Sequence, residues 1–217
     1  MDSRPMYSIA GQLNFAQLAI RNTLANPEIQ GAVIEYGYTP EKMQQGLYLY
    51  DVAIQKVNAR KADAGAQQQA TIQVQEAQTD AWAAFQRLSK VARAILNKGE
   101  LAALGLSGPM PHATAEFLQA GYTLFDNALE AVEVGALPLA EYGYAQERLE
   151  SERAKIVAYD QANQAQEAAK GTAQQATQDQ NAALEALAEW LAQFIKIARV
   201  ALVGKEQLLE VLGVVVR

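Results

Sequence analysis

The sequence predicts an all-α protein, an elongated antiparallel helical bundle with internal duplication, in which two very long helices are packed by shorter ones. Three observations predict this fold. Good helix formers (Ala, Gln, Glu, Leu, Lys and Arg) dominate the composition. All six prolines lie outside residues 41–108 and 139–217, so both stretches are free to form long helices. The chain also resembles itself after a shift of 106 residues, which indicates a repeated architecture.

The internal duplication divides the chain into two helical repeats. Over residues 35–104, 19 positions are identical to the residue 106 places later, without a gap. The matching stretches include Glu35-Tyr36-Gly37-Tyr38 with Glu141-Tyr142-Gly143-Tyr144, Gly65 with Gly171, and Lys90, Ala92 and Arg93 with Lys196, Ala198 and Arg199. We therefore predict repeats at 1–106 and 107–217, related by a pseudo-two-fold axis and packed as one structural unit.

Each repeat is expected to begin with an amphipathic helix and a short second helix. In repeat one the first helix covers Ile9–Ala25. Asn26 is placed to cap the short helix, because Pro27 suits its first position. That helix is expected to end at Tyr36, where Gly37 supplies the left-handed residue that closes many helices.

A long helix follows in each repeat. In repeat one it begins at Thr39-Pro40-Glu41, a cap followed by proline and an acid, and extends to about Leu96. The one candidate break is Gly65, which corresponds to Gly171. Heptad steps from Tyr50 recover the same apolar phase beyond this glycine, as in a coiled coil. A hairpin has no reason to keep that phase, so we favour a continuous helix; a hairpin with an exposed glycine tip is the alternative.

Gly65 and Gly171 need an explanation inside a helix, where glycine costs about 1 kcal/mol relative to alanine. Because alanines surround both, we expect the two long helices to cross at these glycines with a short interaxial distance. The Ala/Gln-rich runs 66–79 and 161–181 would then form a polar, narrow waist. That waist either presents a partner-binding face or is solvated helix.

A linker rich in Gly and Pro, residues 105–114, joins the repeats. The first helix of repeat two is then expected at about Ala113–Val132. In the start of its long helix, Ala145-Gln146 replaces Thr39-Pro40, so the start signal there is weaker.

Composition narrows the function classes. The net charge of −6 argues against binding to nucleic acid, which needs a basic face. The chain has no cysteine, no stretch of about 18 apolar residues and no signal-peptide pattern at its start, which together favour a soluble cytoplasmic protein. Membrane association is disfavoured, although residues 205–216 suggest an amphipathic helix that would allow peripheral binding.

Motifs for catalysis or cofactors are missing from the sequence. It contains no phosphate-binding glycine loop, no Gly-x-Ser-x-Gly and no Glu-x-x-His pair. The single histidine, His112, lies in the linker. We expect no catalytic residue, no cofactor and no metal ligand.

The duplicated residues supply the candidate ligand or partner contacts, which are Tyr36, Tyr38, Arg93, Tyr142, Tyr144 and Arg199. The tyrosines beside each turn glycine would line a pocket or else staple one helix onto the next. Arg93 and Arg199 would hold a carboxylate or phosphate, or else pair with Glu35 and Glu141.

The leading hypothesis is a non-enzymatic structural or protein-interaction protein, whose partner is another protein or a second copy of this chain. A small-molecule binder or enzyme with duplicated Tyr/Arg pockets is the first alternative. A peripheral membrane-associated helical protein is the second.

Overall fold

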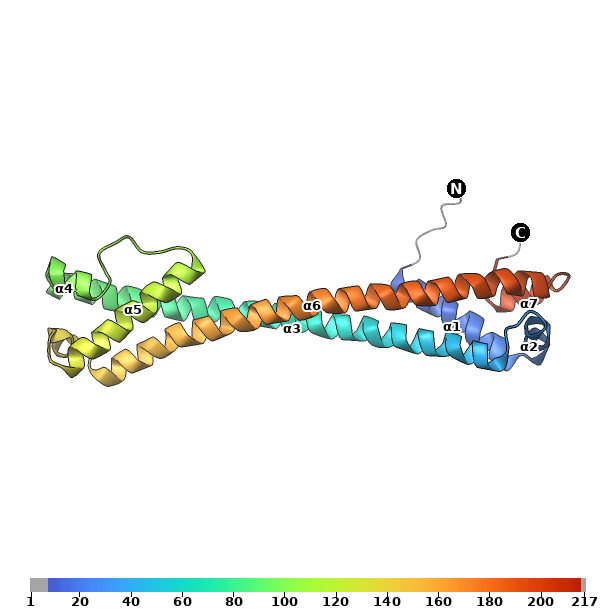
Figure 1. The fold of residues 1–217 in the computed structure, drawn as a ribbon, viewed down its shortest axis with the longest axis horizontal. Coiled ribbons are helices and arrows are strands. Elements are labelled where there is room, and N and C mark those ends of the chain that lie inside the picture. The colour runs from blue at the N-terminus through green and yellow to red at the C-terminus, as the bar shows by residue number, and fades with distance from the viewer. Residues whose placement is uncertain (1–7, 216–217) are drawn as a thin grey trace. The chain divides into compact units, whose positions relative to one another are not determined.

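The computed structural model describes residues 8–215, and within them the regular structure is entirely helical, as Figure 1 shows. The all-α prediction is therefore confirmed. The elements are α1 (Ile9–Ala25), α2 (Pro27–Ile34), α3 (Pro40–Ile95), α4 (Lys98–Ala103), α5 (Thr114–Glu133), the 3-10 helix η1 (Pro138–Tyr142), α6 (Gln146–Ala201) and α7 (Glu206–Val211).

The two long helices follow the sequence repeat. Each contains 56 residues, and α6 begins and ends 106 positions after α3. Both run through their central glycines, Gly65 and Gly171, without a break, so the continuous helix is confirmed and the hairpin alternative is wrong. The hydroxyl oxygen of Thr39 accepts a hydrogen bond from the backbone N–H of Lys42 at 3.4 Å, which satisfies one free N–H group at the start of α3.

Helix α2 and the turn that follows it lead the chain into α3. The Asn26 side chain accepts hydrogen bonds from the backbone N–H groups of Glu28 and Ile29 at 3.0 and 3.3 Å, which confirms its role as the cap of α2. Gly37 has a φ of 83°, which confirms its left-handed conformation. Helix α2 ends at Ile34 rather than at Tyr36, because the two residues before the glycine belong to the closing turn.

The described residues form two compact units. The first unit comprises residues 8–64 and 172–215, and the second comprises residues 65–171. Each unit therefore contains part of α3 and part of α6, and combines segments of both sequence repeats. That the two repeats pack as one structural unit stays a prediction.

In each unit the segments of α3 and α6 run antiparallel. In the second unit Thr71 binds Gln166 and, further along α3, Arg87 binds Glu152, so residue numbers rise on one helix as they fall on the other. In the first unit Lys56 pairs with Asp179 at 2.7 Å, and Gly46, earlier on α3, lies against Trp190, later on α6. The antiparallel packing expected from the sequence is thus present in both units.

The two units share one plan, shown by a pair of matching hydrogen bonds. In the first unit the Asn22 side-chain amide, on α1, donates to the carbonyl of Val211, the last residue of α7, at 2.6 Å. In the second unit the Asn127 side-chain amide, on α5, donates to the carbonyl of Ala103, the last residue of α4, at 2.7 Å. Helices α1 and α5 therefore correspond with a shift of 105 residues, one less than the long helices.

The short helices α4 and α7 also end alike. Each is six residues long and is followed by a glycine of positive φ, Gly105 at 77° and Gly213 at 78°. After each glycine the next residue donates its N–H back to the helix, from Leu106 to Leu101 and from Val214 to Leu209. The glycines donate as well, from Gly105 to Ala102 and from Gly213 to Glu210. Two such hydrogen bonds at one helix end form a Schellman motif. The sequence does not anticipate α4.

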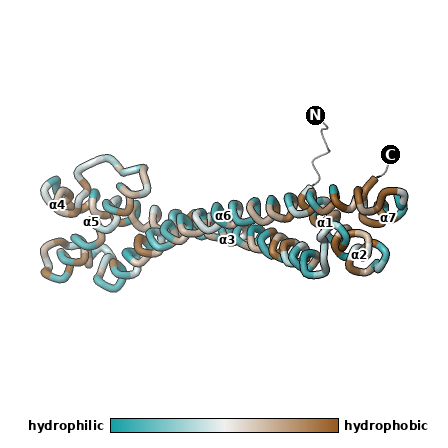
Figure 2. Tube along the Cα trace, turned by 45° about the vertical axis from the view of Figure 1, so that its right-hand side comes forward, coloured by the Kyte–Doolittle hydropathy of each residue, from teal (hydrophilic) through white to brown (hydrophobic). Residues whose placement is uncertain are grey.

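Apolar side chains build a separate core in each unit. The first gathers around Tyr38, Trp190 and Phe194, and the second around Phe85, Phe117 and Tyr159. In Figure 2 the apolar residues are prominent in α1 and α7, whereas the middle stretches of α3 and α6 are mostly hydrophilic. The Ala/Gln-rich runs are thus helical and polar, in agreement with their composition.

Gly65 and Gly171 are both exposed. A Cβ built on either residue would meet no atom within 4 Å outside its own helix turn. The tight packing expected to explain these glycines is therefore not found at their Cβ positions. That the long helices cross at these residues stays a prediction.

The C-terminal segment uses its apolar side chains for packing. Leu209, Leu212 and Val214 are buried in the core of the first unit. Helix α7 covers only Glu206–Val211 of the segment 205–216, whose last residue lies outside the described range. Within residues 8–215, no helix has the length and apolar content needed to cross a membrane.

Candidate functional site

The second tyrosine of each duplicated turn lies in a core. Tyr38 is 3% exposed and Tyr144 is 1% exposed. The Tyr38 ring packs edge-on against Trp190, with centroids 5.9 Å apart, and also contacts Phe194 at 5.1 Å. Burial raises the pKa of both tyrosine hydroxyls above its ordinary value of 10.0. These two residues stay neutral at physiological pH and join the turn to the core.

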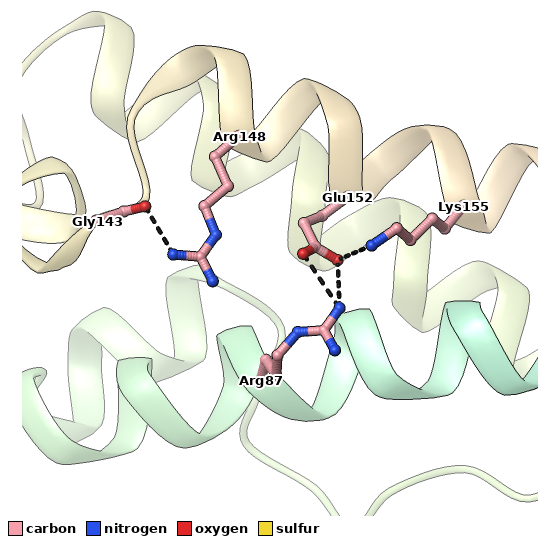
Figure 3. Close-up of polar contacts among 5 residues, drawn as sticks. All are labelled: Arg87, Gly143, Arg148, Glu152 and Lys155. Carbon is pink, nitrogen blue, oxygen red and sulfur yellow. Dashed lines mark hydrogen bonds and ion pairs between the residues drawn. The ribbon is translucent and has the colours of Figure 1, made fainter.

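A cation covers each of these buried rings. The Lys42 ammonium lies 4.1 Å from the ring centroid of Tyr38, and the Arg148 guanidinium lies 4.2 Å from that of Tyr144. Arg148 also donates a hydrogen bond to the carbonyl of Gly143 at 3.0 Å, as Figure 3 shows. Both cations occupy the third position of their long helix, so the same contact is made twice.

The first tyrosine of each turn points into solvent. Tyr36 is 47% exposed and Tyr142 is 54% exposed. The preceding residues, Glu35 and Glu141, are exposed as well. Within residues 8–215 none of these four side chains makes a hydrogen bond, an ion pair or a ring contact.

The duplicated arginines do not join these tyrosines as their repeats suggest. Arg93 belongs to the second unit with Tyr142 and Tyr144, and Arg199 belongs to the first unit with Tyr36 and Tyr38. Both arginines are exposed, and among the described residues neither pairs with Glu35 or Glu141.

Arg93 instead lines a pocket of about 300 Å³ under the linker. The pocket is completed by linker residues 105, 106 and 108–111 and by side chains of α5, among them Glu116 and Thr123. Its lining contains neither Tyr142 nor Tyr144. The Tyr/Arg pocket suggested by the sequence is thus not assembled at this place.

A buried carboxylate forms the clearest charged cluster, which Figure 3 shows. Glu152 on α6 is 7% exposed. Its two oxygens accept hydrogen bonds from Arg87 on α3, at 3.1 and 3.0 Å, and one of them also accepts from Lys155 at 3.1 Å. Burial by itself raises the pKa of Glu152, but the bonds to Lys155 and Arg87 outweigh it, so the net pKa is below 4.5.

This cluster ties two helices together and has no counterpart in the first unit. At the 106-residue shift, Arg87 corresponds to Gln193, Glu152 to Gly46 and Lys155 to Leu49. Glu152 stays ionised at neutral pH and is held by two cations, which suits a structural tie rather than proton transfer. No local sequence signal reveals it, because Arg87 lies on another helix, 65 positions from Glu152, and the pair of Glu152 with Lys155 is an ordinary i,i+3 spacing.

A second polar set joins α5 to α6 in the same unit. The Tyr122 hydroxyl donates to Asp160 at 3.0 Å, and Arg153 pairs with Asp126. Arg153 also lies over the Tyr122 ring, 5.6 Å from its centroid. Each of the four residues makes at least one of these contacts, and each contact joins α5 to α6. We therefore interpret this set as part of the helix packing.

Neither charged set has the composition of a metal centre. Within residues 8–215 no group of three or more His, Asp or Glu side chains is placed to hold a metal ion. Comparison with protein-family models, with curated proteins and with solved structures found no match to this chain. The feature of this chain that bears most directly on function is therefore its own repeated surface.

Proposed function

We propose that the protein is a non-enzymatic, bivalent interaction module, in which each unit presents one Glu-Tyr pair to a protein partner. The single observation behind this proposal is the identical stretch Glu-Tyr-Gly-Tyr in both turns. The positive φ of the turn explains why both repeats have a glycine there, and burial in the core explains why both have the second tyrosine. Nothing within either unit accounts for the exposed pairs Glu35-Tyr36 and Glu141-Tyr142.

Exposed tyrosine beside an acid is well suited to partner recognition. A tyrosine ring offers a large apolar contact area and a polar hydroxyl, and fixing its few rotatable bonds on binding loses little entropy. Tyrosine is accordingly frequent among the residues that dominate interface energies. The adjacent carboxylate favours a basic partner surface with a pocket for the ring. We therefore expect a partner with lysine or arginine around an apolar recess.

Duplication gives two such surfaces, one at Tyr36 in the first unit and one at Tyr142 in the second. One chain would then bind two copies of the partner, or two sites of an oligomeric partner. In the second case, avidity would exceed the affinity of either site alone.

The test begins by identifying the partner with a photo-cross-linking amino acid placed at position 36 or 142, and at the exposed position 48 as a control. Binding of the purified partner is then measured by calorimetry. We expect two sites in the natural protein, one site in Tyr36→Ala and one in Tyr142→Ala, and no binding by the double variant. Circular dichroism verifies that each variant keeps its helical content.

Tyr48 provides a matched control. It is 68% exposed, more than either turn tyrosine, but its counterpart in the other repeat is Ala154. Tyr48→Ala should bind two partners with unchanged affinity. The proposal is wrong if the folded Tyr36→Ala, Tyr142→Ala double variant binds as tightly as the natural protein.

A further inference from the structure

The first unit contains an apolar pocket between α1 and α6. Its volume is about 160 Å³, and its lining includes Phe15, Leu184, Leu187, Ala188 and Leu191. Gln12 provides the one polar side chain of the lining. All of these residues belong to the first unit, so the pocket is formed within a single compact body.

The second unit fills the corresponding place with two aromatic rings. Trp82 and Phe117 stack with centroids 4.8 Å apart and planes 2° from parallel. The 106-residue shift of the long helices takes Trp82 to Ala188. The 105-residue shift that relates Asn22 to Asn127 takes Phe117 to Gln12. Both counterparts line the pocket.

The pocket is therefore the space left where one unit has a tryptophan and a phenylalanine and the other has an alanine and a glutamine. Two lining residues are larger in the first unit, because Phe15 corresponds to Ala120 and Leu187 to Ala81, and yet the pocket stays open. Leu191 is smaller than its counterpart, Phe85. Gln12 and Ala188 of the lining are exposed, so the pocket opens to solvent. Its volume is sufficient for one small ring, since a cavity of about 150 Å³ accepts benzene in another protein. The volume and the lining suit a single small ring.

We propose that this pocket binds a small, uncharged aromatic molecule, of the size class of benzene to indole, whose ring takes the place of the Trp82 side chain. A charged ligand is disfavoured, because the lining contains no charged group to compensate it. This site is separate from the tyrosine turns and goes beyond the interaction role proposed above. It also differs from the Tyr/Arg pockets that the sequence suggested, since none of their residues lines it.

The probe for this proposal is indole, titrated into the full-length protein with ¹³C-labelled alanine and leucine methyl groups. We expect saturable shifts of the Ala188, Ala192 and Leu184 methyl signals, because an aromatic ring shifts the signals of methyl groups against its face. Ala188→Trp places the ring of the second unit into the pocket and should weaken indole binding at least tenfold.

Ala186→Trp is the matched control, because Ala186 is exposed on the same helix and does not line the pocket. It should bind indole as the natural protein does. The converse variant, Trp82→Ala with Phe117→Gln, should open an equivalent pocket in the second unit and raise the stoichiometry from one indole to two.

Three results would overturn the proposal. The first is the absence of saturable shifts at these methyl groups. The second is unchanged indole binding by Ala188→Trp, a test that does not depend on whether the double variant folds. The third is a folded Trp82→Ala, Phe117→Gln variant that still binds one indole.

Discussion

The indole of Trp190 occupies the space that a side chain at position 46 would need. A Cβ built on Gly46 would overlap the six-membered ring of the tryptophan. At the 106-residue shift the same two positions hold Glu152 and Ala84. In the first unit the small residue of the two thus lies early on α3 and the large one on α6. At the equivalent positions of the second unit the small residue, Ala84, lies on α3 and the larger one, Glu152, lies early on α6.

Gly46→Ala should destabilise the first unit. The added methyl group forces the Trp190 ring to move, and overpacking of a core typically costs about 1–3 kcal/mol. The gain in helix propensity from alanine, about 1 kcal/mol, offsets part of this cost. We expect a net loss of up to about 2 kcal/mol in the free energy of unfolding, measured by urea denaturation followed by circular dichroism.

Gly65→Ala is the matched control in the interior of the same helix. Because its Cβ would meet no atom within 4 Å, only the propensity gain remains, and we expect a stabilisation of about 0.5–1 kcal/mol. Destabilisation by Gly65→Ala would instead indicate a close contact at this residue.

Glu152→Gln should weaken the second unit in a pH-dependent way. The pKa of Glu152 in the folded protein lies below its ordinary value of 4.5, so its carboxylate stabilises the fold above that pH. This contribution is lost as the pH falls through the lowered pKa. We expect a loss of about 1 kcal/mol at pH 7, at the low end for a charged hydrogen-bonded pair because Arg87 and Lys155 are well exposed.

Urea denaturation at a series of pH values from 7 downward checks this expectation. The difference between the natural protein and Glu152→Gln should shrink as the solution becomes more acidic than pH 4.5. Glu147→Gln, at an exposed position one turn earlier, should show no such trend. A difference that stays constant with pH would mean that the charge of Glu152 does not contribute.

Asn22→Ala should loosen the end of α7. The substitution removes the hydrogen bond from the Asn22 amide to the carbonyl of Val211, and an internal hydrogen bond contributes about 0.5–1.5 kcal/mol. Hydrogen exchange of the Gly213 and Val214 amides should accelerate roughly two- to tenfold, since both donate to α7. Asn14→Ala, at an exposed position of α1, should leave these rates unchanged.

The continuity of α3 predicts an unbroken run of helical backbone signals through Gly65. The Cα chemical shifts of residues 61–69 should all have helical values, because each of these residues lies in the helix. Non-helical shifts at Gly65 and its neighbours would instead reveal a hairpin there.

The helices could be predicted because their signals are local. Asn26 with Pro27, and Thr39 with Pro40, mark helix starts by satisfying free N–H groups, and Gly37 marks a helix end by its positive φ. The short helix α4 escaped prediction because its six residues are too few for a periodic pattern. Its cap, Asn97 with Glu100, is nevertheless a capping box that the sequence displays.

The sites were harder to predict because they depend on which segments meet. The sequence repeat groups Arg93 with Tyr36, but antiparallel pairing places Arg93 in the unit of Tyr142. Glu152 and Arg87 are 65 positions apart and belong to different repeats, so no spacing rule links them. The match of Phe117 to Gln12 was hidden as well, because α1 and α5 are shifted by 105 residues rather than 106.

The division of the chain into units also sets an order in which they are completed during translation. Residues 65–171 form an uninterrupted segment, so the second unit has all of its parts once its last residue leaves the ribosome. The first unit needs residues 172–215 as well, and until they emerge the apolar faces of α1 and of the start of α3 lack their partner helix. Premature termination between residues 171 and 214 would therefore deprive the first unit of core residues and spare the second. Among the segments that the structure describes, the first to be synthesised is therefore the last to be buried.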